Sequence, residues 1–285
     1  MPNKILVIGA TGMLGEPVAR QLHAAGRPIR VFTRNAEAAR AKFGADYEVV
    51  AGDVENPASL EAALHGCHGV HISLNTGPDP DQERRGVANV AAAAAQAGVQ
   101  RITYLSGATV APENTWYAGT KAKLAAEEAL RASGVPYTIF RATFFMESLP
   151  RFVRGERASF FGSQPHPWHW VAADDYARLV VQAYAAPAAA NKMLYVHGPQ
   201  PWTHRQALET YCAIAHPGVK VSALPFWMAS LIAGLSRDKA MQAALPFFRY
   251  SEKVAEAGDP AGANSLLGAP TTTLEQWSRR QANGV

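Results

Sequence analysis

The stretch Lys4–Gly15 reads KILVIGATGMLG, and it decides which fold the chain predicts. Its apolar first half is typical of a strand that is buried on both faces, and an amphipathic helix follows it directly. Gly9 permits a tight turn, Gly12 lets a ligand approach the backbone, and Gly15 lets the new helix pack closely against the sheet. A helix that starts this way binds phosphate through its unpaired N–H groups and positive dipole end. We therefore predict a site for the pyrophosphate of a dinucleotide; a turn that serves only packing is the alternative.

Strand-like and helix-like segments alternate along the first half of the chain. Helical patterns separate the apolar runs that predict strands, which fall at residues 28–35, 47–51, 69–74, 101–107 and 137–141. This alternation predicts an α/β fold, a Rossmann-type doubly wound parallel sheet with ligands at the carboxyl ends of its strands. Past Pro150 the alternation weakens, but no linker rich in Gly, Ser or Pro marks an independent second domain.

The composition is that of an ordinary globular protein. Of the 285 residues, 48% are hydrophobic and 18% are charged, which suffices for a sizeable core. The formal net charge of +4 comes from scattered Lys and Arg residues, so no nucleic-acid partner is expected. Cys67 and Cys212 have no metal-binding or redox spacing. Because the N-terminus enters a strand directly and no apolar run reaches membrane-spanning length, we expect a reduced, cytoplasmic protein without a membrane partner.

The end of the second predicted strand indicates which cofactor binds. In dinucleotide-binding folds an Asp or Glu about 20 residues past the glycines accepts from the ribose hydroxyls, whereas an Arg suits a 2′-phosphate. Here Arg34 stands 19 residues after Gly15. Its planar guanidinium favours NADP(H); an ordinary solvated arginine is the alternative. The other residues expected to contact the cofactor are Gly9, Thr11, Gly12, Met13, Leu14, Gly15, Asp53, Val54, Leu74, Asn75, Ser106 and Lys121. Asp53 either reaches the adenine edge or caps a turn.

Three residues are candidates for the chemistry of proton and hydride transfer. Tyr117 and Lys121 are four apart, so on a helix they share one face. A nearby ammonium group lowers the pKa of a phenol, which then serves as a general acid or base. Ser106, at the end of a predicted strand, is placed to hydrogen-bond a substrate carbonyl. Since such a spacing also arises by chance, the alternative for Tyr117 is a packing aromatic beside Trp116.

These motifs together resemble the short-chain dehydrogenase/reductase superfamily. The resemblance rests on Gly9-x-x-Gly12-x-x-Gly15, Arg34, Ser106-Gly107 and Tyr117-x-x-x-Lys121. Four later stretches narrow it to the atypical NmrA-like branch, which includes quinone reductase-like and isoflavone reductase-like proteins. They are EEALRASGVPYT from Glu127, RATFFME from Arg141, VAADDYA from Val171 and the tail GAPTTTL from Gly268.

The resemblance implies a single NAD(P)-binding domain over residues 1–285. A small C-terminal substrate lobe would come mainly from about 145–170 and 198–285. It also implies an NADPH-dependent reductase that transfers hydride to a small carbonyl, quinone or enone substrate. A non-catalytic NADP(H) sensor is one alternative, and a nucleotide-sugar epimerase or dehydratase is another.

One departure from the family concerns the catalytic helix. Counted back from Glu127, the lysine of the family falls on Lys123, which puts Gly119 at the position of its tyrosine. Lys121 and Lys123 point about 200° apart on a helix, so both cannot face the cofactor. Either a two-residue shift at the helix start restores the pair of Tyr117 and Lys121, or the site lacks the tyrosine.

The second half of the chain offers candidates for a substrate pocket and none for a metal site. Aromatic and apolar residues either wall a pocket or fill a core between the two parts of the protein: Phe144, Phe145, Met146, Trp168 and Trp170. His166 and His169 flank prolines that direct them to different faces, and no Cys or carboxylate nearby completes a ligand set. The Asp174-Asp175 pair is expected to cap a helix, and the apolar stretch 224–235 to form a helix that covers a pocket.

Overall fold

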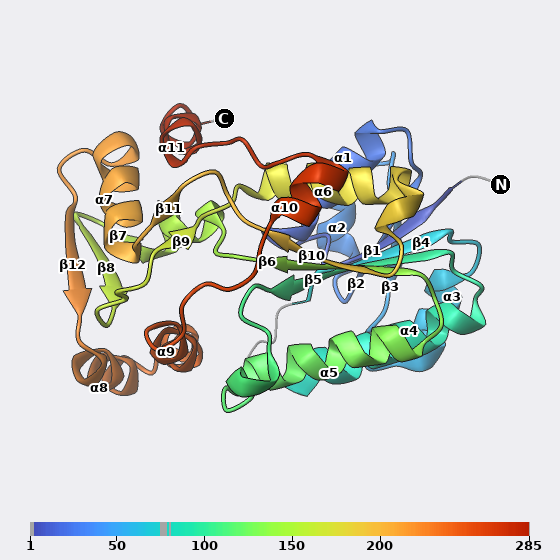
Figure 1. Cartoon of the computed structure of the whole chain (residues 1–285), viewed down its shortest axis with the longest axis horizontal. Helices are drawn as coiled ribbons and strands as arrows, with labels where there is room; N and C mark the ends of the chain where they lie inside the picture. The colour runs from blue at the N-terminus through green and yellow to red at the C-terminus, as the bar shows by residue number, and fades with distance from the viewer. Residues whose placement is uncertain (1–2, 75–78, 80, 285) are drawn as a thin grey trace.

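The computed structural model describes residues 3–74, 79 and 81–284. Its centre is a seven-stranded parallel sheet in the order β10-β6-β5-β4-β1-β2-β3 (Figure 1). The strands are β1 (Ile5–Ile8), β2 (Ile29–Thr33), β3 (Glu48–Ala51), β4 (Gly69–Ile72), β5 (Arg101–Gly107), β6 (Tyr137–Ala142) and β10 (Lys192–Val196). The chain builds outward from β1 to β3 and then resumes beyond β1 with β4, so its direction of growth reverses between β1 and β4. In open parallel sheets, ligands bind at such a switch point.

Helices cover both faces of this sheet, so β1 is buried on both sides. Ile5 and Val7 of β1 point into one core, whereas Leu6 and Ile8 point into the other. The first face carries α1 (Gly15–Ala24), α2 (Ala36–Phe43) and α6 (Ala173–Ala185). The second carries α3 (Pro57–Leu64), α4 (Asp81–Gln96) and α5 (Ala118–Ala132). The doubly wound α/β fold expected from the sequence is confirmed.

A second group of elements lies beside the large sheet, on the left in Figure 1. It contains a three-stranded sheet in the order β12-β8-β7, in which β8 and β12 run parallel, and an antiparallel pair of β9 and β11. The strands of these two small sheets are β7 (Val153–Arg154), β8 (Arg157–Phe161), β9 (Trp168–His169), β11 (Pro201–Trp202) and β12 (Lys220–Leu224). The other elements of the chain are α7 (His204–Ala215), α8 (Phe226–Ser236), α9 (Lys239–Ser251), α10 (Ala261–Leu267), α11 (Leu274–Ala282) and the 3-10 segments η1 (Pro112–Asn114), η2 (Met146–Phe152) and η3 (Pro187–Ala189).

The start of α6 differs from the sequence-based expectation. Asp174 and Asp175 lie in the first turn of the helix, and Ala172 occupies the cap position, so the predicted capping pair is wrong. The carboxylate of Asp175 instead accepts the backbone N–H groups of Thr271 and Thr272, at 2.9 and 2.8 Å. This acidic side chain therefore holds the C-terminal tail against α6.

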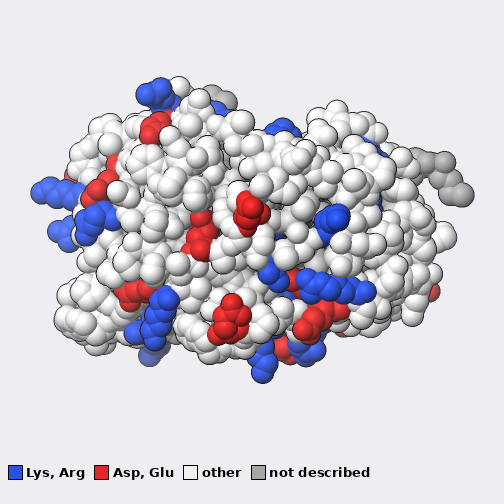
Figure 2. Space-filling view, viewed as in Figure 1, with Lys and Arg blue, Asp and Glu red and all other residues white. Residues whose placement is uncertain are grey.

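The surface carries an exposed apolar helix and a mixture of charges. The helix α8 forms where the sequence predicts one, but the side chains of Trp227, Leu231 and Leu235 point to solvent, and none of its residues lines either cavity described below. Among the described helices, none has both the length and the apolar character that a membrane span requires. On the face drawn in Figure 2, basic and acidic side chains are interspersed.

Candidate active site

The glycine-rich turn connects β1 to α1 at the switch point of the sheet. Gly9 has a φ of +84°, and a Cβ there would lie 2.0 Å from the carbonyl oxygen of Ser73. A Cβ on Gly15 would lie 2.2 Å from the carbonyl oxygen of Gly9, so the start of α1 packs directly on the turn. At Gly12 the nearest atom to such a Cβ is that same oxygen, at 3.3 Å, and the rest of the space is open. Packing therefore requires Gly9 and Gly15, whereas Gly12 leaves backbone accessible to a ligand.

A cleft of about 420 Å³ opens beside this turn. Its walls come from the carboxyl ends of β1, β2, β3 and β4 and from the first turn of α4. Its lining residues are Ile8, Gly9, Thr11, Gly12, Phe32, Thr33, Arg34, Asn35, Gly52, Asp53, Val54, Ser73, Leu74, Gln82 and Glu83. We call it the nucleotide cleft.

The predicted cofactor residues divide between this cleft and other places. Those that line it are Gly9, Thr11, Gly12, Arg34, Asp53, Val54 and Leu74. Met13 lines a second cavity, Leu14 is the N-cap of α1, and Gly15 is buried. Ser106 and Lys121 line neither cavity. Asn75 lies outside the described residues.

The mouth of the nucleotide cleft carries an unpaired cation. Arg34 is exposed there and forms no ion pair with any residue that the structure describes. Its neighbour Asn35 accepts the N–H of Ala38 at 3.0 Å and so caps α2, which fixes the backbone beside Arg34. A guanidinium at this position suits a phosphate group. Asp53 also lines the cleft, and its carboxylate caps a turn by accepting the Glu55 N–H at 2.9 Å.

Lys123, rather than Lys121, points from α5 toward the cleft. Its Nζ lies 2.6 Å from Oε1 of Glu83, which lines the cleft, and 3.4 Å from the carbonyl oxygen of Leu105 at the end of β5. The Tyr104 hydroxyl donates to the same carboxylate oxygen at 2.7 Å. Lys121 is exposed. The structure therefore contradicts the expected pair of Tyr117 and Lys121, and the lysine follows the register of the family.

The buried carboxylate of Glu83 belongs to the wall of the cleft. Glu83 is 1% exposed, yet its Oε2 has no hydrogen-bond partner among the described residues. Buried polar atoms are nearly always paired, so an unpaired one in a cavity wall indicates a position for a ligand donor.

Tyr117 lies just outside α5, at its N-cap position. Its ring stacks on Tyr250, with centroids 4.6 Å apart, and lies 6.2 Å from the ring of Phe247. Burial raises the pKa of Tyr117 to about 12, and Tyr250 and Glu83 add to this effect. This shift is opposite to the lowering expected from a neighbouring ammonium group: the phenol is protonated at neutral pH, but it is a weaker acid than a free tyrosine. The backbone N–H of Lys121 donates to the carbonyl oxygen of Tyr117 at 3.0 Å, but no hydrogen bond joins the Tyr117 hydroxyl to the ammonium group of either lysine in the part of the chain that the structure describes.

Ser106 forms a hydrogen bond with a buried ion pair. Its hydroxyl donates to Oε1 of Glu127 at 2.7 Å. Glu127 is fully buried and also accepts from Arg141, at 3.0 and 2.8 Å, and from Arg131 at 2.9 Å. In this structure the proton of Ser106 therefore serves a network that fastens α5 to β5 and β6, rather than pointing to a substrate as predicted.

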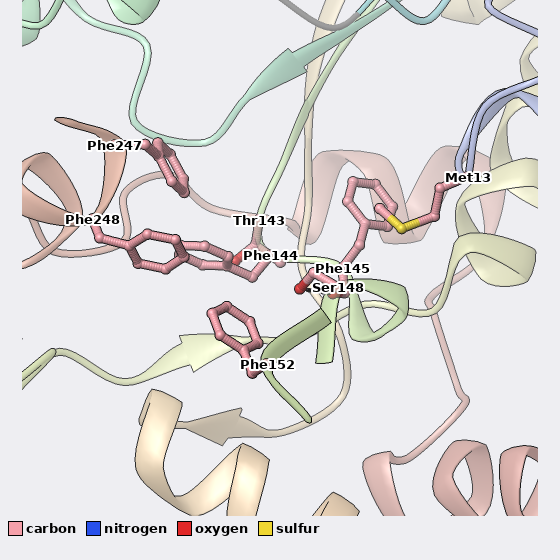
Figure 3. Close-up of a pocket in the computed structure, with 8 residues that line it drawn as sticks. All are labelled: Met13, Thr143, Phe144, Phe145, Ser148, Phe152, Phe247 and Phe248. Atoms are coloured by element: carbon pink, nitrogen blue, oxygen red, sulfur yellow. Dashed lines mark hydrogen bonds between the residues drawn. The ribbon is translucent and has the colours of Figure 1, made fainter. Parts of the chain in front are cut away.

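The second cavity is a smaller, largely apolar pocket of about 230 Å³ (Figure 3). Its lining residues are Met13, Thr143, Phe144, Phe145, Ser148, Phe152, Phe247 and Phe248, and we call it the aromatic pocket. Figure 3 shows Met13 at one end of it and the two α9 residues, Phe247 and Phe248, at the other. Phe144 and Phe145 line it as predicted. Met146 and Trp168 do not, because both are buried in the core behind it; Trp168 packs edge-on against Phe144, with ring centroids 4.8 Å apart.

Several site residues escape sequence reasoning. Phe247 and Phe248 lie in a helix that carries no motif. This helix closes the pocket that is also lined by Phe144 and Phe145, which lie more than 100 positions earlier in the chain. Glu83 sits in the first turn of α4, where acidic residues are common in any helix. In the sequence, Phe247 and Phe248 are simply two adjacent apolar residues, and Glu83 is simply an acidic residue near the start of a predicted helix.

Comparison with known proteins identifies the family. The pattern of an NAD(P)H-binding family matches residues 9–187, more than half of the chain. The chain belongs to this NAD(P)H-binding family. A (4-alkanoyl-5-oxo-2,5-dihydrofuran-3-yl)methyl phosphate reductase of Streptomyces griseus is 34% identical over 207 residues, 71% of this chain and 70% of its own length. An NAD(P)H azoreductase of Xenophilus azovorans is 26% identical and covers 98% of both chains.

The NmrA-like branch and the oxidoreductase class expected from the sequence are confirmed. An NmrA-like oxidoreductase of Aspergillus flavus is 30% identical over 161 residues, 53% of this chain and 50% of its own length. Two solved structures share the fold. The triphenylmethane reductase of Citrobacter sp., complexed with NADP(H), has a TM-score of 0.78 at 23% identity and covers 98% of this chain and 99% of its own. The NADPH-dependent quinone oxidoreductase of Escherichia coli, complexed with NADPH, has a TM-score of 0.76 at 24% identity, with 96% and 98% covered.

Proposed function

We propose that this member of the family is an NADPH-dependent reductase that transfers hydride to a small, apolar carbonyl, quinone or enone compound. The observation that carries the proposal is the position of Met13. It directly follows Gly12 of the nucleotide cleft, and its side chain lines the aromatic pocket. The cleft and the pocket therefore meet at one turn, and a cofactor and a substrate bound in them would be neighbours, as a reaction between them requires.

Three features of the nucleotide cleft suit NADPH. The open backbone at Gly12 and the N-terminus of α1 would hold the pyrophosphate. Arg34 would hold the 2′-phosphate, and the unpaired oxygen of Glu83 would accept from a ribose hydroxyl. When bound there, NADPH supplies the hydride.

The aromatic pocket favours planar, apolar substrates. Of the described residues that line it, Thr143 and Ser148 are polar and the rest are Phe or Met. Such walls stabilise aromatic compounds by burial and ring packing. No Lys or Arg is among the described residues that line the pocket. This argues against the epimerase or dehydratase alternative, whose nucleotide-sugar substrate carries a diphosphate.

Reduction of such a substrate also requires a proton. We assign its donation to Tyr117, because its ring neighbours the pocket residue Phe247. Lys123, in place of Lys121, is the positioning residue: its ammonium holds the carboxylate of Glu83 at the cleft wall. The relatives named as an azoreductase, a quinone oxidoreductase and a triphenylmethane reductase support the same class of reaction. A substrate lobe made by about 145–170 and 198–285 is part of this proposal, since η2 and α9 contribute pocket walls.

The test is NADPH oxidation by the purified protein across a panel of quinones, enones, aldehydes and aromatic dyes. We expect turnover with planar apolar compounds. Phe247→Ala in the pocket should raise the KM for such a compound at least about threefold, the loss expected for a partly buried ring. Trp227→Ala on the exposed helix α8 should leave this KM unchanged. Micromolar NADPH binding without turnover of any compound would overturn the reductase. The lack of a hydrogen bond between the Tyr117 hydroxyl and a lysine ammonium among the described residues would then favour the second candidate function, an NADP(H) sensor.

A further inference from the structure

A group of ionisable side chains lies next to the aromatic pocket but outside the nucleotide cleft. It consists of His169 at the end of β9, His197 just after β10 and Glu256 in the segment between α9 and α10. The nitrogen and oxygen atoms that these three residues offer all lie within 4.8 Å of one another. The His166 and His169 pair considered in the sequence is not part of it, because the partners of His169 come from elements that are distant in the chain.

The two oxygens of Glu256 have different surroundings. Oε1 accepts the hydroxyl of Thr143 and, at 3.0 Å, the backbone N–H of His169. Oε2 is hydrogen-bonded to Nδ1 of His169 and lies 3.8 Å from Nδ1 of His197. One oxygen is therefore fixed by neutral donors, while the other faces two imidazole nitrogens.

His197 has the orientation of a metal ligand. Its Nε2 lies 3.2 Å from the carbonyl oxygen of Ala257, which can only accept, so Nε2 carries the proton. The lone pair of the neutral ring is then on Nδ1, which faces Glu256. A ring N–H that donates to a backbone carbonyl in this way is the usual support of a metal-bound histidine. The rings of His169 and His197 are nearly parallel, 12° apart in plane with centroids 5.3 Å apart.

We propose that His169, His197 and Glu256 form a binding site for a divalent transition metal of the Zn²⁺ type. Two imidazoles and a carboxylate are a donor set that Zn²⁺ takes at about 2.0–2.2 Å, which places tetrahedral ligand atoms about 3.3 Å apart. Side-chain rotation within the group brings the three donor atoms to this spacing. Binding would replace the proton between His169 and Glu256, and this proton would leave to solvent. His169 has 36% of its side chain exposed, so the fourth position is open to water.

The site would tie three distant parts of the chain together. Glu256 belongs to the segment that follows the pocket helix α9, and Thr143, which bonds to it, lines the aromatic pocket. A metal at this position would fix the C-terminal wall of the pocket to the ends of β6 and β10. The inference does not depend on the proposed reductase activity, because binding is measured without NADPH or substrate.

The experiment is calorimetric titration of the tag-free, chelator-treated protein with ZnCl₂. We expect one Zn²⁺ per chain with micromolar or tighter affinity. His169→Ala and Glu256→Gln should each weaken binding on the order of tenfold or more. The matched control His166→Ala removes a histidine only three positions away from the same loop, and it should bind Zn²⁺ like the parent.

Co²⁺ titration gives a second reading that does not depend on heat. Binding should produce visible absorption bands of a low-coordinate Co²⁺ site in the parent and in His166→Ala, and lose them in His169→Ala, with circular dichroism to confirm that each variant is folded. If Glu256→Gln does not fold, the partly exposed His169 still provides the test. Absent binding or binding no tighter than millimolar in the parent, or unchanged binding in folded His169→Ala, would overturn the metal site.

Discussion

The phenol ring of Tyr117 lies directly against Gly119. A Cβ on Gly119 would fall 2.6 Å from Cε1 of that ring and 3.0 Å from its hydroxyl oxygen. In the register of the family, residue 119 is the tyrosine position. In this chain the ring reaches that place from the N-cap, two residues earlier, because glycine leaves the space for it. The structure thus differs from both possibilities raised by the sequence: the lysine that reaches Glu83 is Lys123, and the ring beside Gly119 comes from Tyr117.

Replacing the hydroxyl tests whether this shifted tyrosine donates the proton. Tyr117→Phe should lower kcat about a hundredfold or more on a substrate that the parent reduces, the scale of a positioned general acid. The dissociation constant of NADPH should stay the same, because the hydroxyl is not assigned to the cofactor. Full activity in the variant, measured by NADPH oxidation, would show that solvent or the substrate provides the proton.

Gly119→Ala displaces the ring without removing it. The added methyl group would overlap Cε1, so we expect kcat to fall about tenfold while NADPH affinity is retained. Gly262→Ala in α10 is the control, since a Cβ there meets no atom within 4 Å. Equal kcat values for the two variants would mean that the position of the Tyr117 ring has no part in turnover.

The two lysines of α5 should differ sharply. Lys123→Met leaves the buried carboxylate of Glu83 without its cation, so the free energy of unfolding should drop by about 2–4 kcal/mol and NADPH binding should weaken. Lys121→Met changes an exposed side chain and should alter neither. Urea unfolding and calorimetry measure the two effects. The reverse order would place Lys121 at the cofactor.

Cofactor preference tests the guanidinium at the mouth of the cleft. Arg34→Asp should raise the dissociation constant of NADPH at least about tenfold and lower that of NADH, because a carboxylate repels the 2′-phosphate and accepts from the ribose hydroxyls. Arg40→Asp, on the exposed side of α2, makes the same change of charge away from the cleft and serves as control. Similar affinities of the parent for NADPH and NADH would contradict the assignment.

A buried acid predicts how stability changes with pH. Burial raises the pKa of Glu147 from its ordinary 4.5 to about 7, although its Oε1 accepts from Ala173 N–H and Trp277 Nε1. Between these pH values the native state holds a proton that the unfolded state has lost, so this group lowers stability as pH rises and its full cost is present above pH 7. Glu147→Gln keeps the Oε1 acceptor and should therefore gain roughly 2–3 kcal/mol over the parent at pH 8, and nothing at pH 4.

Urea unfolding at both pH values measures this difference. Glu61→Gln, on the exposed side of α3, should track the parent throughout. A constant difference between Glu147→Gln and the parent across the two pH values would mean that the pKa of Glu147 is not raised in the native state.

A feature of this protein can be predicted from the sequence when neighbouring residues determine it, and not when its partners are distant in the chain. The strands, the glycine turn and Arg34 depend on neighbouring residues, so periodicity and spacing identify them. The hydrogen bond of Ser106 depends on a distant residue. Its hydroxyl donates to Glu127, which lies in another element, and nothing near Ser106 in the sequence indicates that partner. The aromatic pocket is intermediate, because Phe144 and Phe145 lie in a recognisable stretch whereas Phe247 and Phe248 approach from α9.

The parallel pairing of β8 with β12 has a consequence for the way the chain folds. Arg157 pairs with Lys220, and α6, β10 and α7 lie between the two strands. During synthesis, β8 and its hairpin partner β7 emerge long before β12, with an unpaired strand edge on β8. Contacts that close so long a loop form slowly, so the small sheet should be the last part to assemble. A chain that ends before residue 220 would keep this edge exposed and should aggregate, even though all strands of the large sheet are present.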